Sequence, residues 1–158
     1  MPEKNDKEYK EGLRRAAALC GKQEQCSSQV REKLDRWGIS SDTAERILES
    51  LKAEKFLDDS RYATYFVRDK FKLNAWGRIK IGVLLKRKGI EEAIIREALR
   101  EIDEESYIGT CTRLIREKAR SLQESSAYAR KGKLFRFAAG RGFESDLIHR
   151  ILDSEENL

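Results

Sequence analysis

The stretch Leu84-Leu85-Lys86-Arg87-Lys88-Gly89-Ile90 decides the fold of this 158-residue chain, because related stretches occur before and after it. The earlier copy reads Lys33-Leu34-Asp35-Arg36-Trp37-Gly38-Ile39, and the later copy reads Phe137-Ala138-Ala139-Gly140-Arg141-Gly142-Phe143. The aligned glycines lie 51 and 53 positions apart, and apolar residues match at the flanking positions. A nearly fixed period of this length indicates a repeated structural unit.

Each copy is typical of a helix that ends at glycine and is followed closely by another helix. Glycine adopts the left-handed conformation of a helix end without a steric penalty, and the next apolar residue packs back on the helix. Acidic residues such as Glu91 and Glu92 follow the turn and suit the positive end of the next helix dipole. The pattern therefore predicts a helix pair in each repeat, including a helix over residues 77–88.

Roughly 25 residues precede each pair, which is enough for one more helix. We expect these first helices over about 8–20, 58–74 and 104–121. The only proline is Pro2, and apolar residues recur at a spacing of four, as in Ile81 and Leu85. The sequence thus predicts an all-α fold of three tandem three-helix repeats.

The expected domains are 1–56, with a flexible N-terminus, then 57–102 and 103–158. Neighbouring repeats must stack to bury their apolar faces, so we expect an elongated, curved rod. Charged residues make up 39% and apolar residues 39% of the chain, against about 25% and 45–50% in typical globular proteins. A rod has a large surface, and this composition agrees with one.

Several classes of protein and site are excluded by residue type. No apolar run reaches the roughly 18–20 residues of a membrane span, and residues 1–12 lack the apolar segment of a secretory signal, so we expect a cytoplasmic protein. The three cysteines contain no Cys-x-x-Cys pair, and the only histidine is His149, which argues against a disulfide framework or a zinc site. We expect small buried thiols at the cysteines.

No catalytic arrangement is recognisable. His149 has no nucleophile near it in sequence, and no Gly-Lys-Ser/Thr phosphate loop is present. The pair Asp58-Asp59 is better explained as a helix cap than as a metal site. We therefore predict a protein that is not an enzyme and has no cofactor.

Positive charge is concentrated in two segments, although the net charge is only +5. Residues 61–100 contain 11 basic and 4 acidic side chains, and residues 113–141 contain 9 basic and 2 acidic ones. This asymmetry favours a binding surface for an acidic partner. A sequence-specific DNA-reading helix is improbable, because Asp42, Glu91 and Asp146 would face phosphates and base edges with the wrong sign.

The expected helix over 77–88 has two apolar faces. Ile81 and Leu85 lie on one face, whereas Ile79 and Val83 lie on the opposite one, flanked by basic residues. Either Ile79 and Val83 pack against an adjacent repeat, or they form an exposed apolar anchor with a basic rim, as in a protein interface. The sequence leaves both alternatives open.

Three separated landmarks resemble those of the RecX regulatory proteins. They read Leu57-Asp58-Asp59-Ser60-Arg61-Tyr62-Ala63, Trp76-Gly77-Arg78 and Arg141-Gly142-Phe143, and the resemblance runs from about Leu13 to Leu152. Most landmark residues suit caps, packing and turns. The family's usual Arg-x-Ser-x-x-Glu-Leu-like start of the second helix is replaced here by Gln25-Cys26-Ser27-Ser28-Gln29-Val30, which puts the role of the first repeat in doubt.

The resemblance implies a non-catalytic regulator that binds the RecA nucleoprotein filament. Similar proteins lower the recombinase, ATPase and coprotease activities of RecA in DNA repair and the SOS response. We expect a monomer whose basic side chains carry the contact. The candidates are Arg61, Arg78, Lys80, Lys86, Arg87, Lys88, Lys133, Arg136 and Arg141. The alternatives are an independent, non-sequence-specific protein that binds single- or double-stranded DNA weakly, and a scaffold for another partner.

Overall fold

A computed structural model of the chain describes residues 2–154 and 158, and it consists of helices joined by short loops. Nine helices and no strand occur within those residues. The helices are α1 (Pro2–Lys22), α2 (Ser27–Arg36), α3 (Ser41–Ala53), α4 (Asp59–Asn74), α5 (Arg78–Arg87), α6 (Glu92–Arg100), α7 (Glu104–Ser121), α8 (Ala127–Gly140) and α9 (Ser145–Ser154).

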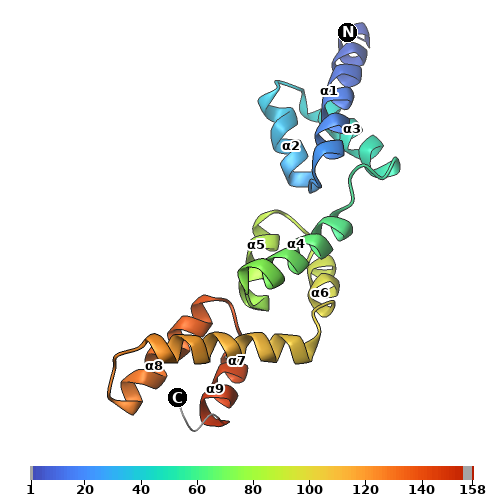
Figure 1. Ribbon diagram of the computed structural model, residues 1–158. Helices are drawn as coiled ribbons and strands as arrows, with labels where there is room; N and C mark the ends of the chain where they lie inside the picture. The colour runs from blue at the N-terminus through green and yellow to red at the C-terminus, as the bar shows by residue number, and fades with distance from the viewer. Residues whose placement is uncertain (1, 155–157) are drawn as a thin grey trace.

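The helices form three groups, which we call module 1 (α1–α3), module 2 (α4–α6) and module 3 (α7–α9). Figure 1 shows the modules following one another along a bent, elongated path, with the N-terminus at one end and module 3 at the other. The extensive helix–helix contacts lie within each module. The predicted all-α fold of three three-helix repeats is confirmed.

The first helix of each module agrees with the sequence prediction in two modules and is longer in the third. α4 and α7 match the expected ranges 58–74 and 104–121 within one residue, but α1 begins at Pro2 instead of near residue 8. Proline is compatible with the first turn of a helix, where its missing N–H group has no helical partner to lose. The expected flexible N-terminus is therefore helical from Pro2 onward.

The three turn glycines have the predicted conformation. Gly38 and Gly89 have φ values of 78°, and Gly142 has a φ of 97°. In each turn the amide of the next apolar residue donates back to a carbonyl oxygen of the preceding helix, as Ile90 does to Leu85 with an N–O distance of 3.2 Å. The same arrangement occurs at Ile39 and at Phe143, so the three turns are structurally equivalent.

The buried side chains form two hydrophobic cores. Module 1 has its own core, built on Leu34, Ile47 and Leu51 among others. Modules 2 and 3 share a second, continuous core that includes Leu85 and Tyr107. Modules 2 and 3 are thus joined by apolar packing, whereas module 1 packs mainly on itself.

Two of the three cysteines are fully buried and the third is partly buried, as expected for small apolar thiols. Cys26 belongs to the core of modules 2 and 3 although it precedes α2, and Cys111 lies in the same core. Burial raises the pKa of the Cys111 thiol to about 12, with a smaller effect from nearby Glu144. Such a thiol stays protonated and inert at neutral pH.

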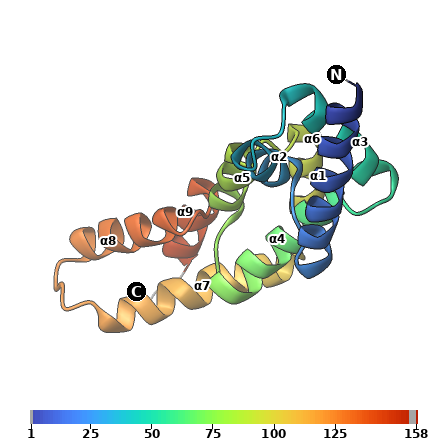
Figure 2. The same ribbon diagram turned by 90° about the horizontal axis from the view of Figure 1, so that it is seen from above.

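The second helices of the modules meet end to end. At the start of α5, the amide of Gly77 donates to the carbonyl oxygen of Arg141 at 2.7 Å, and the amide of Ile79 donates to that of Gly142 at 3.0 Å. At the end of α5, the carbonyl oxygen of Lys88 accepts from the hydroxyl of Ser28. Figure 2 shows α8, α5 and α2 following one another in this order.

These end-to-end contacts satisfy backbone groups that a helix terminus leaves without a partner. They also require two close glycines. A Cβ atom on Gly77 would collide with the backbone of Gly142 and Phe143, and a Cβ atom on Gly142 would lie 2.8 Å from the amide nitrogen of Lys80. The backbones of modules 2 and 3 are therefore in direct contact.

We predict that Gly77→Ala lowers the free energy of unfolding by about 1–3 kcal/mol, because the added methyl group overpacks a backbone contact that cannot yield locally. Urea denaturation followed by circular dichroism measures the change. Gly109→Ala on α7 is the matched control: a Cβ atom there meets nothing within 4 Å, so it should stabilise the helix by about 0.5–1 kcal/mol. Equal effects of the two substitutions would contradict the close contact.

Candidate partner-binding surface

Arg78 joins modules 2 and 3 from the start of α5. Its guanidinium donates to Glu104 of α7 and, at 3.1 Å, to Glu144 at the start of α9, and it lies 3.9 Å from the centre of the Tyr107 ring. The Tyr107 hydroxyl accepts from the backbone amide of Arg78 at 2.9 Å and donates to Glu144. Arg78 is therefore a component of the junction between the two modules.

The Tyr107 hydroxyl is held in its protonated form by this junction. Burial of the ring raises the pKa of Tyr107 well above its usual value of 10.0, and the hydrogen bond to Glu144 raises the pKa further. A protonated hydroxyl can donate to Glu144 while it accepts from Arg78, which an ionised oxygen could not do.

Arg61 and Asp59 join modules 1 and 2, whereas the neighbouring Asp58 serves its own helix. Asp58 caps its own helix by accepting from the amide of Arg61 at 3.0 Å, as predicted. Asp59 instead accepts from the amide of Ser27 at 2.9 Å and so caps α2 in the preceding module. The Arg61 side chain pairs with Glu24 of α1, with an Nε–Oε1 distance of 2.6 Å.

Arg141 also has a partner across a junction. Its Nη2 donates to the carbonyl oxygen of Asn74 at 2.6 Å, beside the contact between Gly77 and its own carbonyl oxygen. Arg61, Arg78 and Arg141, three of the nine predicted contact residues, are thus engaged in holding the modules together. The other six lie on the second helices of modules 2 and 3: Lys80, Lys86 and Arg87 on α5, Lys88 at its C-cap, and Lys133 and Arg136 on α8.

α5 and α8 contain no acidic residue. Lys86 and Arg87 are exposed at the end of α5, and neither has an ion-pair partner within residues 2–154 and 158. Lys133 of α8 pairs with Glu124 at 3.3 Å, and the guanidinium of Arg136 lies beside Gly132 one turn away. Because α5 and α8 meet end to end, their cations extend over two modules.

Three lysines of module 2 lie against aromatic rings, which the sequence analysis missed. The ammonium of Lys80 lies 4.3 Å from the centre of the Trp76 ring, and Lys70 approaches the same ring at 5.0 Å. Lys88 lies 5.8 Å from the centre of the Phe66 ring. These attractions hold the lysine side chains in place on the surface.

Ile79 and Val83 are exposed on α5, at 52% and 45% of their possible surface. They therefore do not pack against an adjacent module, and the exposed alternative is the one found. Their spacing of four places them on one helix face, with Arg87 one turn further along. We refer to Ile79, Lys80, Val83, Lys86 and Arg87 as the α5 surface.

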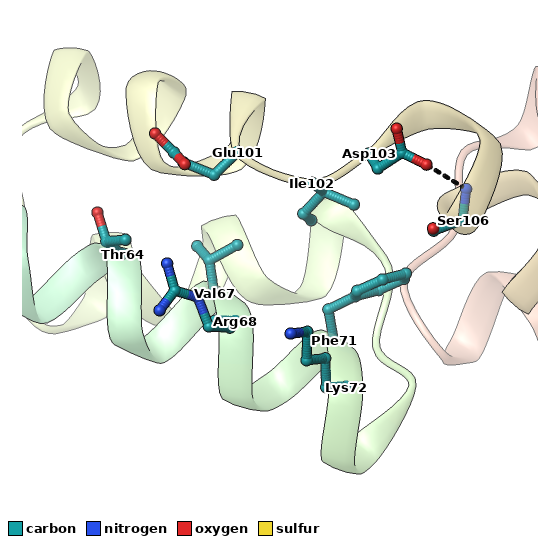
Figure 3. Close-up of a pocket in the computed structure, with 9 residues that line it drawn as sticks. All are labelled: Thr64, Val67, Arg68, Phe71, Lys72, Glu101, Ile102, Asp103 and Ser106. Carbon is teal, nitrogen blue, oxygen red and sulfur yellow. Dashed lines mark hydrogen bonds between the residues drawn. The ribbon is translucent and has the colours of Figure 1, made fainter.

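A pocket of about 320 Å³ lies beside the link between α6 and α7 (Figure 3). Val67, Phe71 and Ile102 provide its apolar part, while Arg68 of α4 and Glu101 of the link contribute opposite charges. The mixed charges give no net attraction for an acidic partner, so this pocket is not part of the basic surface. Its remaining lining residues are Thr64, Lys72, Asp103 and Ser106.

In the part of the chain that the structure describes, no helix is both long enough and apolar enough to cross a membrane. No cluster of three or more histidine, cysteine or acidic side chains among the same residues could hold a metal ion.

Comparison with known protein families identifies the fold. The model of the second three-helix domain of RecX matches residues 58–99, and that of the third three-helix domain matches residues 105–152. These spans cover more than half of the sequence. The chain belongs to the RecX family. The resemblance seen in the sequence is confirmed, while residues 1–57 lie outside both spans.

Individual RecX proteins are similar over different shares of their length. A regulatory protein RecX of Prosthecochloris aestuarii is 33% identical over 149 residues, which are 94% of this chain and 96% of the relative. Another of the same name, from Clostridium perfringens, is 36% identical over 126 residues, which are 78% of this chain but 58% of the relative. The chain thus spans nearly all of one relative and little more than half of the other.

A crystal structure of RecX from Lactobacillus salivarius has the same fold. It matches this chain with a TM-score of 0.87 at 22% identity, over 94% of this chain and 96% of the other. At this identity the match shows the fold alone. The relatives are named regulatory proteins, and that general role is the one the comparisons support.

We predict that Tyr107→Phe lowers the free energy of unfolding at pH 7 by about 1–3 kcal/mol, because the Arg78 amide and Glu144 each lose a hydrogen-bond partner. The wild type should lose additional stability above about pH 10, because its unfolded chain ionises the hydroxyl before the folded protein does. Tyr107→Phe should lack that alkaline component.

Urea denaturation at pH 7 and at pH 11 measures both effects. Tyr65→Phe is the control, since Tyr65 is 45% exposed on α4. An unchanged alkaline loss in Tyr107→Phe would contradict the raised pKa of this hydroxyl.

Proposed function

We propose that this chain regulates the RecA recombinase by binding the RecA nucleoprotein filament, and that it does so without catalysing a reaction. Membership of the RecX family supports this proposal. The structural observation on which it rests is the exposed α5 surface, with its apolar centre and basic rim. The partner is cytoplasmic, so the chain acts in the cytoplasm, as a monomer.

The α5 surface suits a protein partner better than a DNA backbone. Exposed Ile79 and Val83 need an apolar counterpart, which a row of phosphates does not offer. An apolar centre with a polar rim is the usual anatomy of a protein interface. Lys86 and Arg87 at that rim would meet acidic residues, which speeds association and sets its orientation.

The arrangement of the modules also supports binding to a filament. Because α2, α5 and α8 meet end to end, the chain forms an elongated, bent body (Figures 1 and 2). A protein of this shape can follow a groove and contact more than one subunit of a helical assembly. Cations on α5 and α8 then act together along that groove.

An independent DNA-binding protein is the second candidate function, favoured by the four cations and the absence of acids in α8. Contacts to phosphates would make its affinity fall steeply with salt, because each neutralised phosphate releases a counterion. The two candidates differ in what inhibits RecA. If DNA binding were the cause, inhibition would occur only where the free protein already covers the DNA.

We predict that Ile79→Ser/Val83→Ser, and separately Lys86→Glu/Arg87→Glu, raise by about tenfold or more the concentration that inhibits single-stranded-DNA-dependent ATP hydrolysis by RecA. The first pair removes the apolar centre and the second reverses the charge of the rim. The assay titrates each protein into RecA at substoichiometric ratios and moderate salt.

Arg96→Glu/Arg100→Glu on α6 is the matched control, since it makes the same change of charge at exposed positions of module 2. It should inhibit like the wild type. Full inhibition of RecA by both α5 variants would show that the α5 surface is not the contact. An equal loss of inhibition in the α6 control would show the same. Absence of inhibition by the wild type would overturn the proposed function itself.

A further inference from the structure

A second pocket lies between α8 and α9, at the end of α8 away from the contact with α5. Its volume is about 550 Å³, within the range of small-molecule sites. α8 has 14 residues, so its two ends lie about 20 Å apart. The lining residues are Tyr128, Ala129, Lys131, Gly132, Lys133, Phe135, Arg136, His149, Leu152 and Asp153.

Aromatic rings form part of this pocket. Phe135 of α8 and His149 of α9 are stacked, with ring centres 4.8 Å apart and ring planes inclined by 27°. Tyr128, the second residue of α8, is 91% exposed. Three rings therefore line one pocket, and two of them already stack on each other.

Three cationic side chains, Lys131, Lys133 and Arg136, also line the pocket, together with the acidic Asp153. Lys131 is paired with Asp153 at 3.8 Å, and Lys133 with Glu124 at 3.3 Å. Arg136, by contrast, has no acidic partner among the described residues. A Cβ atom on residue 132 would lie 3.4 Å from its Nη1, so glycine leaves room for the guanidinium along the helix.

Each of these features is common on protein surfaces, but their combination in one pocket matches a specific chemistry. A nucleotide joins a flat aromatic base to a negatively charged phosphate. Proteins that bind unpaired nucleotides stack the bases on aromatic side chains and neutralise the phosphates with lysine and arginine. An aliphatic ligand would leave the cations unused, and a simple anion would leave the rings unused.

We propose that the pocket between α8 and α9 binds a nucleotide, with the base stacked on Tyr128 or on the Phe135–His149 pair and the phosphate at Arg136. The nucleotide is either a free mononucleotide or one unit of a single strand, and both present the same two groups. Binding needs neither RecA nor the α5 surface, so its failure would leave the proposed regulation of RecA unaffected. Binding of a single strand would deepen the second candidate function, which rests on the cations of α8.

The only histidine of the chain provides a direct probe of the pocket. The Hε1 proton of His149 gives a single, isolated NMR resonance, and a base stacked nearby shifts it through its ring current. The experiment titrates the full-length protein with thymidine monophosphate, with a ten-residue oligothymidylate, and with inorganic phosphate. We expect a saturable shift with one or both nucleotide ligands and a much smaller one with phosphate.

Variants locate the site by fluorescence anisotropy with the labelled oligothymidylate. Tyr128→Ala and Arg136→Ala should each weaken binding by about tenfold, as loss of one stacked base or one phosphate contact does. The controls remove the same residue types elsewhere: Tyr65→Ala on α4 and Arg113→Ala on α7, both at exposed positions. The controls should bind within about twofold of the wild type.

The outcomes separate the possible ligands. A shift with the mononucleotide assigns the pocket to free nucleotides, and a shift with the oligomer alone assigns it to a strand. Equal shifts with inorganic phosphate would overturn the proposal, since the rings would then take no part. Equal competition by duplex DNA, or loss of binding in the controls alone, would overturn it as well.

Discussion

The contact between the backbones of Gly77 and Gly142 is the constraint on which the arrangement of modules 2 and 3 depends. It brings the first amides of α5 onto the last carbonyl oxygens of the α8–α9 turn. Only glycine permits this approach on either side. The hydrogen bonds and ion pairs of Arg78 surround the contact and fix its orientation, so that α5 follows directly on α8.

Much of the fold was predictable because its determinants are local. The turn glycines, the polar residues after them and the four-residue apolar spacing each depend on neighbours within a few positions. The start of α1 at Pro2 was missed because a charged, proline-initiated segment carries no apolar periodicity. Whether Ile79 and Val83 were buried could not be read from spacing, since that depends on where the next module lies.

The nine predicted contact residues show that positive charge in the sequence does not separate a cation that holds the modules together from one that is free to bind a partner. Arg61, Arg78 and Arg141 differ from Lys86 and Arg87 only in having an acidic or carbonyl partner from a distant part of the chain. No pattern near these arginines indicates such partners. The pocket between α8 and α9 also escaped notice, although Tyr128 followed by four cations within nine positions was a usable signal.

The separation of the two cores divides the chain into two cooperative units. The core of module 1 shares no apolar cluster with modules 2 and 3, apart from Cys26, which belongs to the second cluster. Module 1 can therefore separate from the larger core by breaking few contacts. These are the polar ties through Asp59, Glu24 and Ser28 and the burial of Cys26. Amide hydrogen exchange would then report one opening free energy for module 1 and another for modules 2 and 3. The chain combines a two-module body that shares one core with a first module that can open as a unit of its own.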